Sequence, residues 1–341
     1  MTGSFLLPQP PEKIPELEEI FLPVKKDLAS VERILRSWPK ATPVVLRRLT
    51  AGAIRRQGKL IRPGILLLIA GHLGISQRKR AAVLAAAVET MHLASLIHDD
   101  IIDRSAFRRG VKTALEKFGP DFSLLLGDFL FVHSLATSFS VKDPAITALL
   151  AEAAREMIEG ETEELASSYN FNLSQKKYMK IIAKKTATLF RTTCRLACRL
   201  GKASLRETRA LENYGFNLGL TFQIIDDLLD ITGDPKKTGK PVFSDLKEGR
   251  ITLPLIIALK KSDDRGKEEL KRRLEHFKNN PEPEIPGLIL DWLKKSGALE
   301  DTLNQAFIQA EKARASLKIL NPTAHRESLA RLIDFVLWRN N

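Results

Sequence analysis

Apolar residues recur along this chain at the three- and four-residue spacing of amphipathic helices. Long runs of this kind cover residues 81–103 and 149–168, which are rich in Ala and Leu and contain no proline. No stretch alternates between polar and apolar residues as a half-buried strand does. Short breaks that contain Gly or Pro separate the helical runs, at residues 110–113, 118–121, 233–241 and 279–286. The pattern predicts an all-α fold, a bundle of about ten or more helices.

None of these breaks has the composition of a domain linker, so we expect residues 1–341 to form a single domain. Hydrophobic residues make up 44% of the chain, which is enough for a sizeable core. Prolines crowd the start of the chain, so residues 1–20 are expected to be irregular. They do not resemble a signal peptide. No uninterrupted apolar run approaches the length of a membrane span. The expected location is therefore cytoplasmic.

The net charge of +13 favours polyanionic partners, namely nucleic acid, an anionic membrane or phosphorylated small molecules. Aromatic residues do not interleave with the basic runs, which argues against single-stranded nucleic acid. The two cysteines, Cys194 and Cys198, have no metal-ligand spacing to other His or Cys residues. They are interpreted as core thiols in a reducing compartment.

Two acidic turns repeat one pattern. Residues 98–103, HDDIID, are echoed by residues 225–230, IDDLLD, and each turn ends a strongly apolar helical run. The first cluster comprises Asp99, Asp100 and Asp103, and the second comprises Asp226, Asp227 and Asp230. Carboxylates four residues apart project from the same side of a helix, where they repel one another. A solvated acidic turn would explain one such cluster, but two clusters within apolar sequence favour cation binding at the mouth of a cavity. Hard oxygen ligands without nearby cysteines favour Mg²⁺.

Basic residues accompany both acidic turns. They comprise Lys59 and Arg62 in GKLIRP, His92 two turns before the first cluster, Arg108 and Arg109 after it, Lys185 before Thr186, and Lys240 after the second cluster. Taken singly, each basic residue is more often a solvated surface charge. Together they supply enough positive charge for two diphosphates in one pocket, with Arg suited to bidentate phosphate contacts and Lys acting as a point charge.

These motifs resemble the trans-type polyprenyl synthases, the family of farnesyl, geranylgeranyl and longer-chain prenyl diphosphate synthases. The resemblance covers residues 50–255 continuously, with a weaker match to the end. It is carried by GKLIRP, by DDIID with RRG, by LGD at residues 126–128, by KT at 185–186, by FQIIDDLLD at 222–230, by GK at 239–240 and by DLKEG at 245–249. It implies a helical bundle around a central cavity, and a homodimer.

The resemblance also implies roles for individual residues. Asp99, Asp103 and Asp226 would be the principal ligands of a cluster of about three Mg²⁺ ions, with Asp100, Asp227 and Asp230 in support. Arg108, Lys185 and Lys240 would hold the allylic diphosphate, and Lys59, Arg62, His92 and Arg109 would hold isopentenyl diphosphate. Thr186 and Gln223 would point oxygen atoms at the allylic carbocation.

The chain departs from the family pattern at three positions. The family usually has a basic residue in place of Leu60, often has Gln in place of Glu164, and commonly has Gly in place of Phe243. None of these departures removes a ligand. Leu60 and Glu164 are expected to weaken diphosphate binding slightly, and Phe243 bears on the shape of the loop that covers the second acidic cluster.

Three other functions would explain part of the pattern. A terpene cyclase would use one similar acidic turn, but would lack the all-Asp second site and the basic motifs for a second diphosphate. A non-catalytic subunit of a heteromeric synthase would be expected to have lost part of a cluster. A nucleic-acid binder explains only the charge. The absence of a spanning segment remains compatible with release of a lipid product at a membrane.

Product length depends on residues along the helix that ends at Asp99. Ala94 and Ser95 lie one turn deeper than Asp99, with Met91 one further turn down. In the resembling family, short-product enzymes tend to carry an aromatic residue at the level of Ala94 and Ser95. Small side chains there favour a long product of about six isoprenyl units or more over one of about C15 to C20, with Met91 able to yield or to act as a later floor. In the alternative, Phe129 or Phe131 forms the floor.

Overall fold

The computed structural model describes residues 13–41, 44–54, 58–108, 110–234, 242–279 and 285–339, and they are almost entirely helical. The first half contains α1 (Leu17–Ile20), η1 (Leu22–Val24), α2 (Lys25–Ala41), α3 (Val44–Ile54), α4 (Ile61–His72), α5 (Arg78–Ile102), α6 (Ala114–Phe118), α7 (Pro120–Phe139) and α8 (Pro144–Leu165). The second half contains α9 (Gln175–Ile182), η2 (Ala183–Ala187), α10 (Thr188–Gly201), α11 (Leu205–Thr232), α13 (Ser244–Lys247), α14 (Leu253–Lys261), α15 (Asp264–Asn279), α16 (Ile285–Lys295), α17 (Ala298–Ser316), η3 (Leu317–Ile319) and α18 (Ala324–Trp338). The prediction of an all-α bundle is confirmed.

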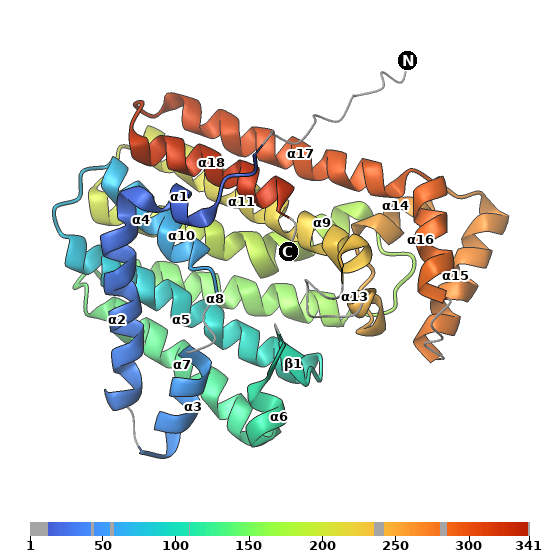
Figure 1. Cartoon of the computed structure of the whole chain (residues 1–341), viewed down its shortest axis with the longest axis horizontal. Helices are drawn as coiled ribbons and strands as arrows, with labels where there is room; N and C mark the ends of the chain where they lie inside the picture. Colours follow the sequence, from blue (N-terminus) through green and yellow to red (C-terminus); the bar gives the residue numbers. More distant parts are fainter. Residues whose placement is uncertain are drawn as a thin grey trace.

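Helices α5, α8, α10 and α11 cross the middle of the molecule, and α17 and α18 run along one side of it (Figure 1). Helix α5 packs on α7, and α11 packs on both α10 and α17. Buried residues from the N-terminal to the C-terminal helices form one large hydrophobic cluster. A smaller cluster lies between α3, α5, α6 and α7. A single domain over residues 1–341 stays a prediction, which the shared large cluster supports.

Two features differ from the sequence expectations. Residues 1–12 lie outside the described residues, but Leu17–Ile20, within the segment expected to be irregular, form the turn of helix α1. A small antiparallel hairpin is also present, in which β1 (Phe107–Arg108) pairs with β2 (Val111–Lys112). Each strand is only two residues long, too short to show an alternating pattern, and Gly110 supplies the positive φ of 72° that a tight hairpin turn requires.

Two described helices, α5 and α7, are long and apolar enough to cross a membrane by length and composition alone. Polar residues interrupt both helices, so neither is an unbroken apolar run in the sequence. Within its most apolar window, 72% of α5 is buried inside the protein, as expected for a core helix, against 33% for α7. Helix α7 is therefore apolar and largely uncovered.

Candidate active site

A cavity of about 520 Å³ lies among α4, α5, α7, α8, α10 and α11. Of the residues that the structure describes, seven carboxylates line it, namely Asp99, Asp103, Glu161, Glu164, Asp226, Asp227 and Asp245. Four Lys and Arg side chains line it as well, namely Arg62, Arg108, Lys185 and Arg250. Much of the remaining wall is apolar, with Leu124, Phe131, Met157, Leu189 and Phe222 among its residues. The cavity therefore combines a strongly charged region with an apolar one.

The first acidic cluster lies at the C-terminal end of α5, where the helix dipole already disfavours negative charge. Asp99 lines the cavity, and among the described residues no side chain forms a hydrogen bond or an ion pair with it. Burial raises the pKa of Asp99, although Lys185 and Arg108 counteract this effect. Asp103 also lines the cavity and accepts a hydrogen bond of 2.8 Å from Arg250. Asp100 is 4% exposed and is paired with Arg108, with 2.7 Å between Oδ1 and Nε.

The second acidic cluster lies near the C-terminal end of α11, and its three carboxylates have different surroundings. Asp226 lines the cavity and accepts a hydrogen bond of 2.5 Å from Arg339, which follows the last residue of α18. Asp227 is buried and is held by the Tyr178 hydroxyl and by the Gln223 amide, the latter at 2.9 Å.

The third member of that cluster, Asp230, is not among the residues that line the cavity. It accepts hydrogen bonds from the Ser244 hydroxyl and from the Asp245 backbone amide. Burial and the nearby Asp245 carboxylate raise the pKa of Asp230 to about 7. Of the six predicted metal ligands, Asp99, Asp103, Asp226 and Asp227 therefore line the cavity, whereas Asp100 and Asp230 are not among its lining residues.

Lys185 and Thr186 lie in a single π-helical turn, η2, between α9 and α10. Such turns are rare and are often found at functional sites. Helix α8 approaches this turn closely because residue 160 is glycine; a Cβ atom there would lie 2.5 Å from the backbone nitrogen of Lys185. Thr186 donates a hydrogen bond of 2.7 Å to the Gln223 side-chain oxygen. Thr186, Gln223 and Asp227 thus form one hydrogen-bonded series beside the cavity.

The predicted binding site for isopentenyl diphosphate is only partly assembled in the described residues. Arg62 is 8% exposed and lines the cavity. Its guanidinium carbon lies 4.4 Å from the centroid of the Phe190 ring. Burial lowers the pKa of Arg62 to about 10, although Glu89 and Asp226 act in the opposite direction. His92 lines the cavity, but Lys59 is exposed and lies 5.5 Å from the Phe335 ring. Arg109 and Lys240 lie outside the described residues.

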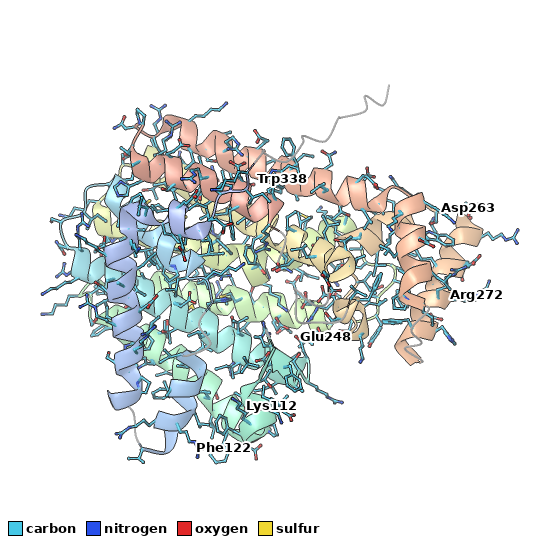
Figure 2. All side chains as sticks on the ribbon, in the orientation of Figure 1. Lys112, Phe122, Glu248, Asp263, Arg272 and Trp338 are labelled. Atoms are coloured by element: carbon cyan, nitrogen blue, oxygen red, sulfur yellow. The ribbon has the colours of Figure 1, made fainter. Side chains whose placement is uncertain are left out.

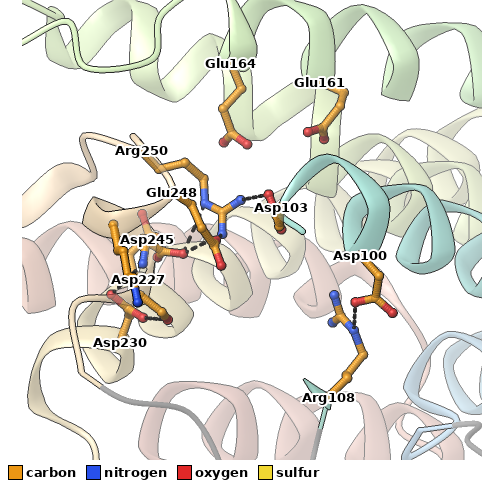
Figure 3. A network of polar contacts seen from close by, with 12 residues as sticks. Asp100, Asp103, Arg108, Glu161, Glu164, Asp227, Asp230, Asp245, Glu248 and Arg250 are labelled. Carbon is orange, nitrogen blue, oxygen red and sulfur yellow. Dashed lines mark hydrogen bonds and ion pairs between the residues drawn. The ribbon is translucent and has the colours of Figure 1, made fainter. Parts of the chain in front are cut away.

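Two basic residues at the carboxylates were missed by the sequence analysis. Arg250 is paired with Asp103, Asp245 and Glu248 (Figure 3). It directly follows the recognised DLKEG motif, so its position offered a signal. Arg339 has no such signal, because it lies 113 residues from Asp226 in the sequence.

The departures from the family pattern have visible structural consequences. Phe243 is 1% exposed and packs against Phe277, and its φ of 59° lies in the left-handed region that favours glycine. Its backbone amide donates to the carbonyl of Asp230, so Phe243 is held directly against the second acidic turn. Leu60 also has a positive φ, of 51°, and its side chain is buried.

The residues predicted to control product length divide between cavity and core. Ser95 lines the cavity, whereas Ala94 and Met91 are both 0% exposed and are not among the lining residues. Ala94 instead belongs to the smaller hydrophobic cluster that faces α3, α6 and α7. Of the alternative floor residues, Phe131 lines the cavity, and Phe129 stacks on His133 away from it.

The donor set fits magnesium. Asp99 is a cavity carboxylate without a partner among the described residues, and the oxygen-only donors are the type that Mg²⁺ binds. Among these residues no three acidic, His or Cys side chains are already gathered around one point. This suits Mg²⁺, which commonly takes one or two carboxylates and completes its shell with water and substrate phosphates. The Nε atom of Arg62 is buried and has no hydrogen-bond partner among the described residues, which fits an anion close by.

An all-α bundle with two acidic helix ends facing one partly apolar cavity is the architecture of an enzyme that acts on prenyl diphosphates. The family profile for polyprenyl synthetase matches residues 43–285, and the chain belongs to that family of prenyltransferases. It is 32% identical over 326 residues to an octaprenyl diphosphate synthase of Escherichia coli, covering 95% of this chain and 99% of that one.

Other relatives make different products or act as components. The chain is 32% identical over 314 residues to a short chain isoprenyl diphosphate synthase of Methanothermobacter thermautotrophicus, covering 91% of this chain and 95% of that one. It is 30% identical to heptaprenyl diphosphate synthase component 2 of Bacillus subtilis, covering 91% and 87%.

Solved structures resemble the protein over nearly its whole length. A polyprenyl synthase from Caulobacter crescentus, crystallised with calcium and isoprenyl diphosphate, has a TM-score of 0.91 and 33% identity, covering 97% of this chain and 100% of that one. A decaprenyl diphosphate synthase from Rhodobacter capsulatus has a TM-score of 0.87 and 30% identity, covering 96% and 100%.

Proposed function

We propose that this prenyltransferase condenses isopentenyl diphosphate head-to-tail with an allylic diphosphate and makes a long all-trans polyprenyl diphosphate of about C30 or longer. The observation that supports the proposal is that Asp99 and Asp226, one from each acidic cluster, both line one cavity whose remaining wall is largely apolar. Such a cavity suits a substrate with a charged head and a hydrocarbon tail.

Magnesium ions, when bound to Asp99, Asp103 and Asp226, would draw negative charge onto the leaving diphosphate. Arg108, Lys185 and Lys240 then hold that diphosphate as the allylic C–O bond ionises. Preorganised cations of this kind stabilise charge as it develops.

The second substrate is held by Lys59, Arg62, His92 and Arg109, and its double bond attacks the allylic cation. The Thr186 hydroxyl and the Gln223 amide oxygen lie beside the cavity, where they stabilise the cation. The proton is then lost to the departing diphosphate. Apolar side chains such as Leu189 exclude the water that would quench the cation.

A long product is supported by Ser95, a small residue on the cavity wall one helical turn below Asp99. The names of the octaprenyl and decaprenyl relatives support it as well. A short product of about C15 to C20 is the alternative, supported by the equally similar short-chain relative and by Phe131, which lines the cavity and could act as a floor.

We also propose that two copies of the chain assemble through α7. Phe122, Leu125, Val132 and Phe139 are spaced so that they follow one side of this helix, and they are 51–67% exposed. Phe122 lies at the outer edge of the molecule (Figure 2). Exposed apolar residues grouped on one side of a helix are typical of an interaction surface. A dimer in analytical ultracentrifugation that becomes monomeric in Val132→Glu would support this assembly, and a monomeric wild type would exclude it.

A non-catalytic role in a heteromeric synthase is the alternative of a different class, prompted by the component 2 relative. Both acidic clusters are complete, which favours catalysis by this chain alone. Burial of α5 is that of a core helix, and we propose a cytoplasmic location for the enzyme.

The decisive experiment incubates the purified protein with labelled isopentenyl diphosphate, Mg²⁺ and each allylic primer in turn, and then measures product length. A magnesium-dependent product of about C30 or longer is expected. A product of C20 or shorter would refute the long-chain proposal. Failure with every primer would favour the non-catalytic alternative, and activity that appears only on addition of a second subunit would establish it.

A further inference from the structure

Two glutamates of α8 hold the lysine that is assigned to the allylic diphosphate. The Lys185 ammonium lies 2.6 Å from a Glu161 carboxylate oxygen and 2.5 Å from one of Glu164. All three side chains are largely buried, with 16–20% of each exposed. Figure 3 shows both glutamates descending from α8 toward Arg250 and Asp103. Lys185 is therefore already engaged by two carboxylates.

The electrostatics of the cavity depend on this contact. Burial alone would lower the pKa of Lys185, but the carboxylates of Glu164, Asp99 and Glu161 raise it above its ordinary value. Lys185 is therefore cationic, and two carboxylates, those of Glu161 and Glu164, contact its single positive charge. Among the described residues, seven carboxylates but only four Lys and Arg side chains line the cavity. Each carboxylate repels an anionic substrate and so weakens its binding.

We propose that Glu164 is a positioning residue that restrains Lys185 and so weakens binding of the allylic diphosphate. An incoming diphosphate must compete with Glu164 for the ammonium and is also repelled by the carboxylate itself. A neutral amide at this position would leave Lys185 paired with Glu161 alone. This inference rests on the proposed function, since it assigns Lys185 to the allylic substrate.

The neighbouring glutamate provides a matched control. Glu163 lies on the same helix and binds the adjacent lysine, with 2.7 Å between its Oε1 and the Lys184 ammonium. It also lies 3.5 Å from the Lys180 ammonium, and it is not among the cavity-lining residues. Glu163→Gln therefore removes a similar charge and a similar lysine contact from the outer side of the same two elements.

Steady-state kinetics of wild type, Glu164→Gln, Glu164→Asp and Glu163→Gln test the inference. Glu164→Gln is expected to lower the KM for the allylic diphosphate by roughly tenfold, at the lower end of the effect seen for close charge pairs in desolvated contacts. Its KM for isopentenyl diphosphate should change much less. Glu164→Asp, which retains the charge but shortens the reach to Lys185, should lower the allylic KM less than Glu164→Gln does, and Glu163→Gln should resemble wild type.

Calorimetric binding of inorganic pyrophosphate without magnesium provides a readout that does not depend on turnover. Binding should be tighter in Glu164→Gln than in wild type and unchanged in Glu163→Gln. If Glu164→Gln leaves both the allylic KM and pyrophosphate binding unchanged, or weakens either, the inference is wrong. Equal changes in the two glutamine variants would overturn it as well. Absence of turnover in wild type itself would instead count against the proposed function.

Discussion

Replacement of Ser95 with phenylalanine tests how the cavity limits product length. Ser95 lines the cavity four residues before Asp99, and its hydroxyl donates a hydrogen bond of 2.8 Å to the carbonyl of His92. A phenylalanine ring in its place would project into the space that a growing prenyl tail has to occupy. Loss of the hydroxyl contact should cost little, because its acceptor is the backbone carbonyl of the preceding helical turn.

The expected magnitude follows from helix geometry. Four residues of α5 span about 6 Å along the helix axis. An isoprenyl unit extends roughly 5 Å, because it adds four carbon–carbon bonds of about 1.5 Å in a zigzag. A ring at position 95 would thus leave room for about one or two units below the ionising carbon, and one more unit is added in the final condensation. The Ser95→Phe product should therefore stop at about C15.

The assay is product analysis by reversed-phase chromatography and mass spectrometry after extended incubation with excess isopentenyl diphosphate. Ala94→Phe is the matched comparison, because Ala94 is the adjacent residue and is packed at 0% exposure in the smaller hydrophobic cluster. It should lower the free energy of unfolding by about 1–3 kcal/mol through overpacking, with little effect on product length in the protein that remains folded. An unchanged product in Ser95→Phe, or shortening by Ala94→Phe alone, would contradict the placement of the tail.

Five further substitutions test other parts of the site. Asp226→Ala should lower magnesium-dependent turnover by roughly a hundredfold or more without loss of helical circular dichroism, and near-normal turnover would contradict a two-cluster mechanism. Lys59→Ala should raise mainly the KM for isopentenyl diphosphate and Lys185→Ala mainly that for the allylic primer, whereas equal effects on both substrates would show the assignment to be wrong. Tyr178→Phe should lower the free energy of unfolding in urea by about 1–3 kcal/mol, because the buried Asp227 carboxylate loses a donor; unchanged stability would argue against that contact. The pKa of Asp230 is raised from 3.8 to about 7, so between these pH values the folded state binds a proton that the unfolded state releases. Without metal, the free energy of unfolding should therefore fall as the pH rises from 3.8 to about 7. Asp230→Asn should remove part of this pH dependence. A slope that persists in full would indicate another group.

Much of the chemistry could be predicted from local sequence. The spacing of Asp99 and Asp103 places both on one side of a helix, and the helical pattern around them has no competing strand signal. Both carboxylates line the cavity in the structure. The helical class was equally predictable, because helix periodicity is a property of neighbouring residues.

The partners of those carboxylates were decided by tertiary structure. Arg250 meets Asp103 and Arg339 meets Asp226 because distant helices pack together, and no spacing rule connects residues so far apart in the sequence. The two acidic turns are alike in sequence, but Asp230 is held by the Ser244 hydroxyl and the Asp245 backbone amide, whereas Asp103 is paired with the Arg250 side chain. That difference depends on where the chain returns after α11.

The sequence also could not predict which side of α5 faces the cavity. Ala94 and Ser95 are neighbours whose side chains point about 100° apart around the helix. A helix with one apolar stripe would reveal which of them faces the core, but α5 is buried on most sides and carries small or apolar residues nearly all round. Only its packing against α7 on one side and the cavity on the other places Ser95 on the wall and Ala94 in the core.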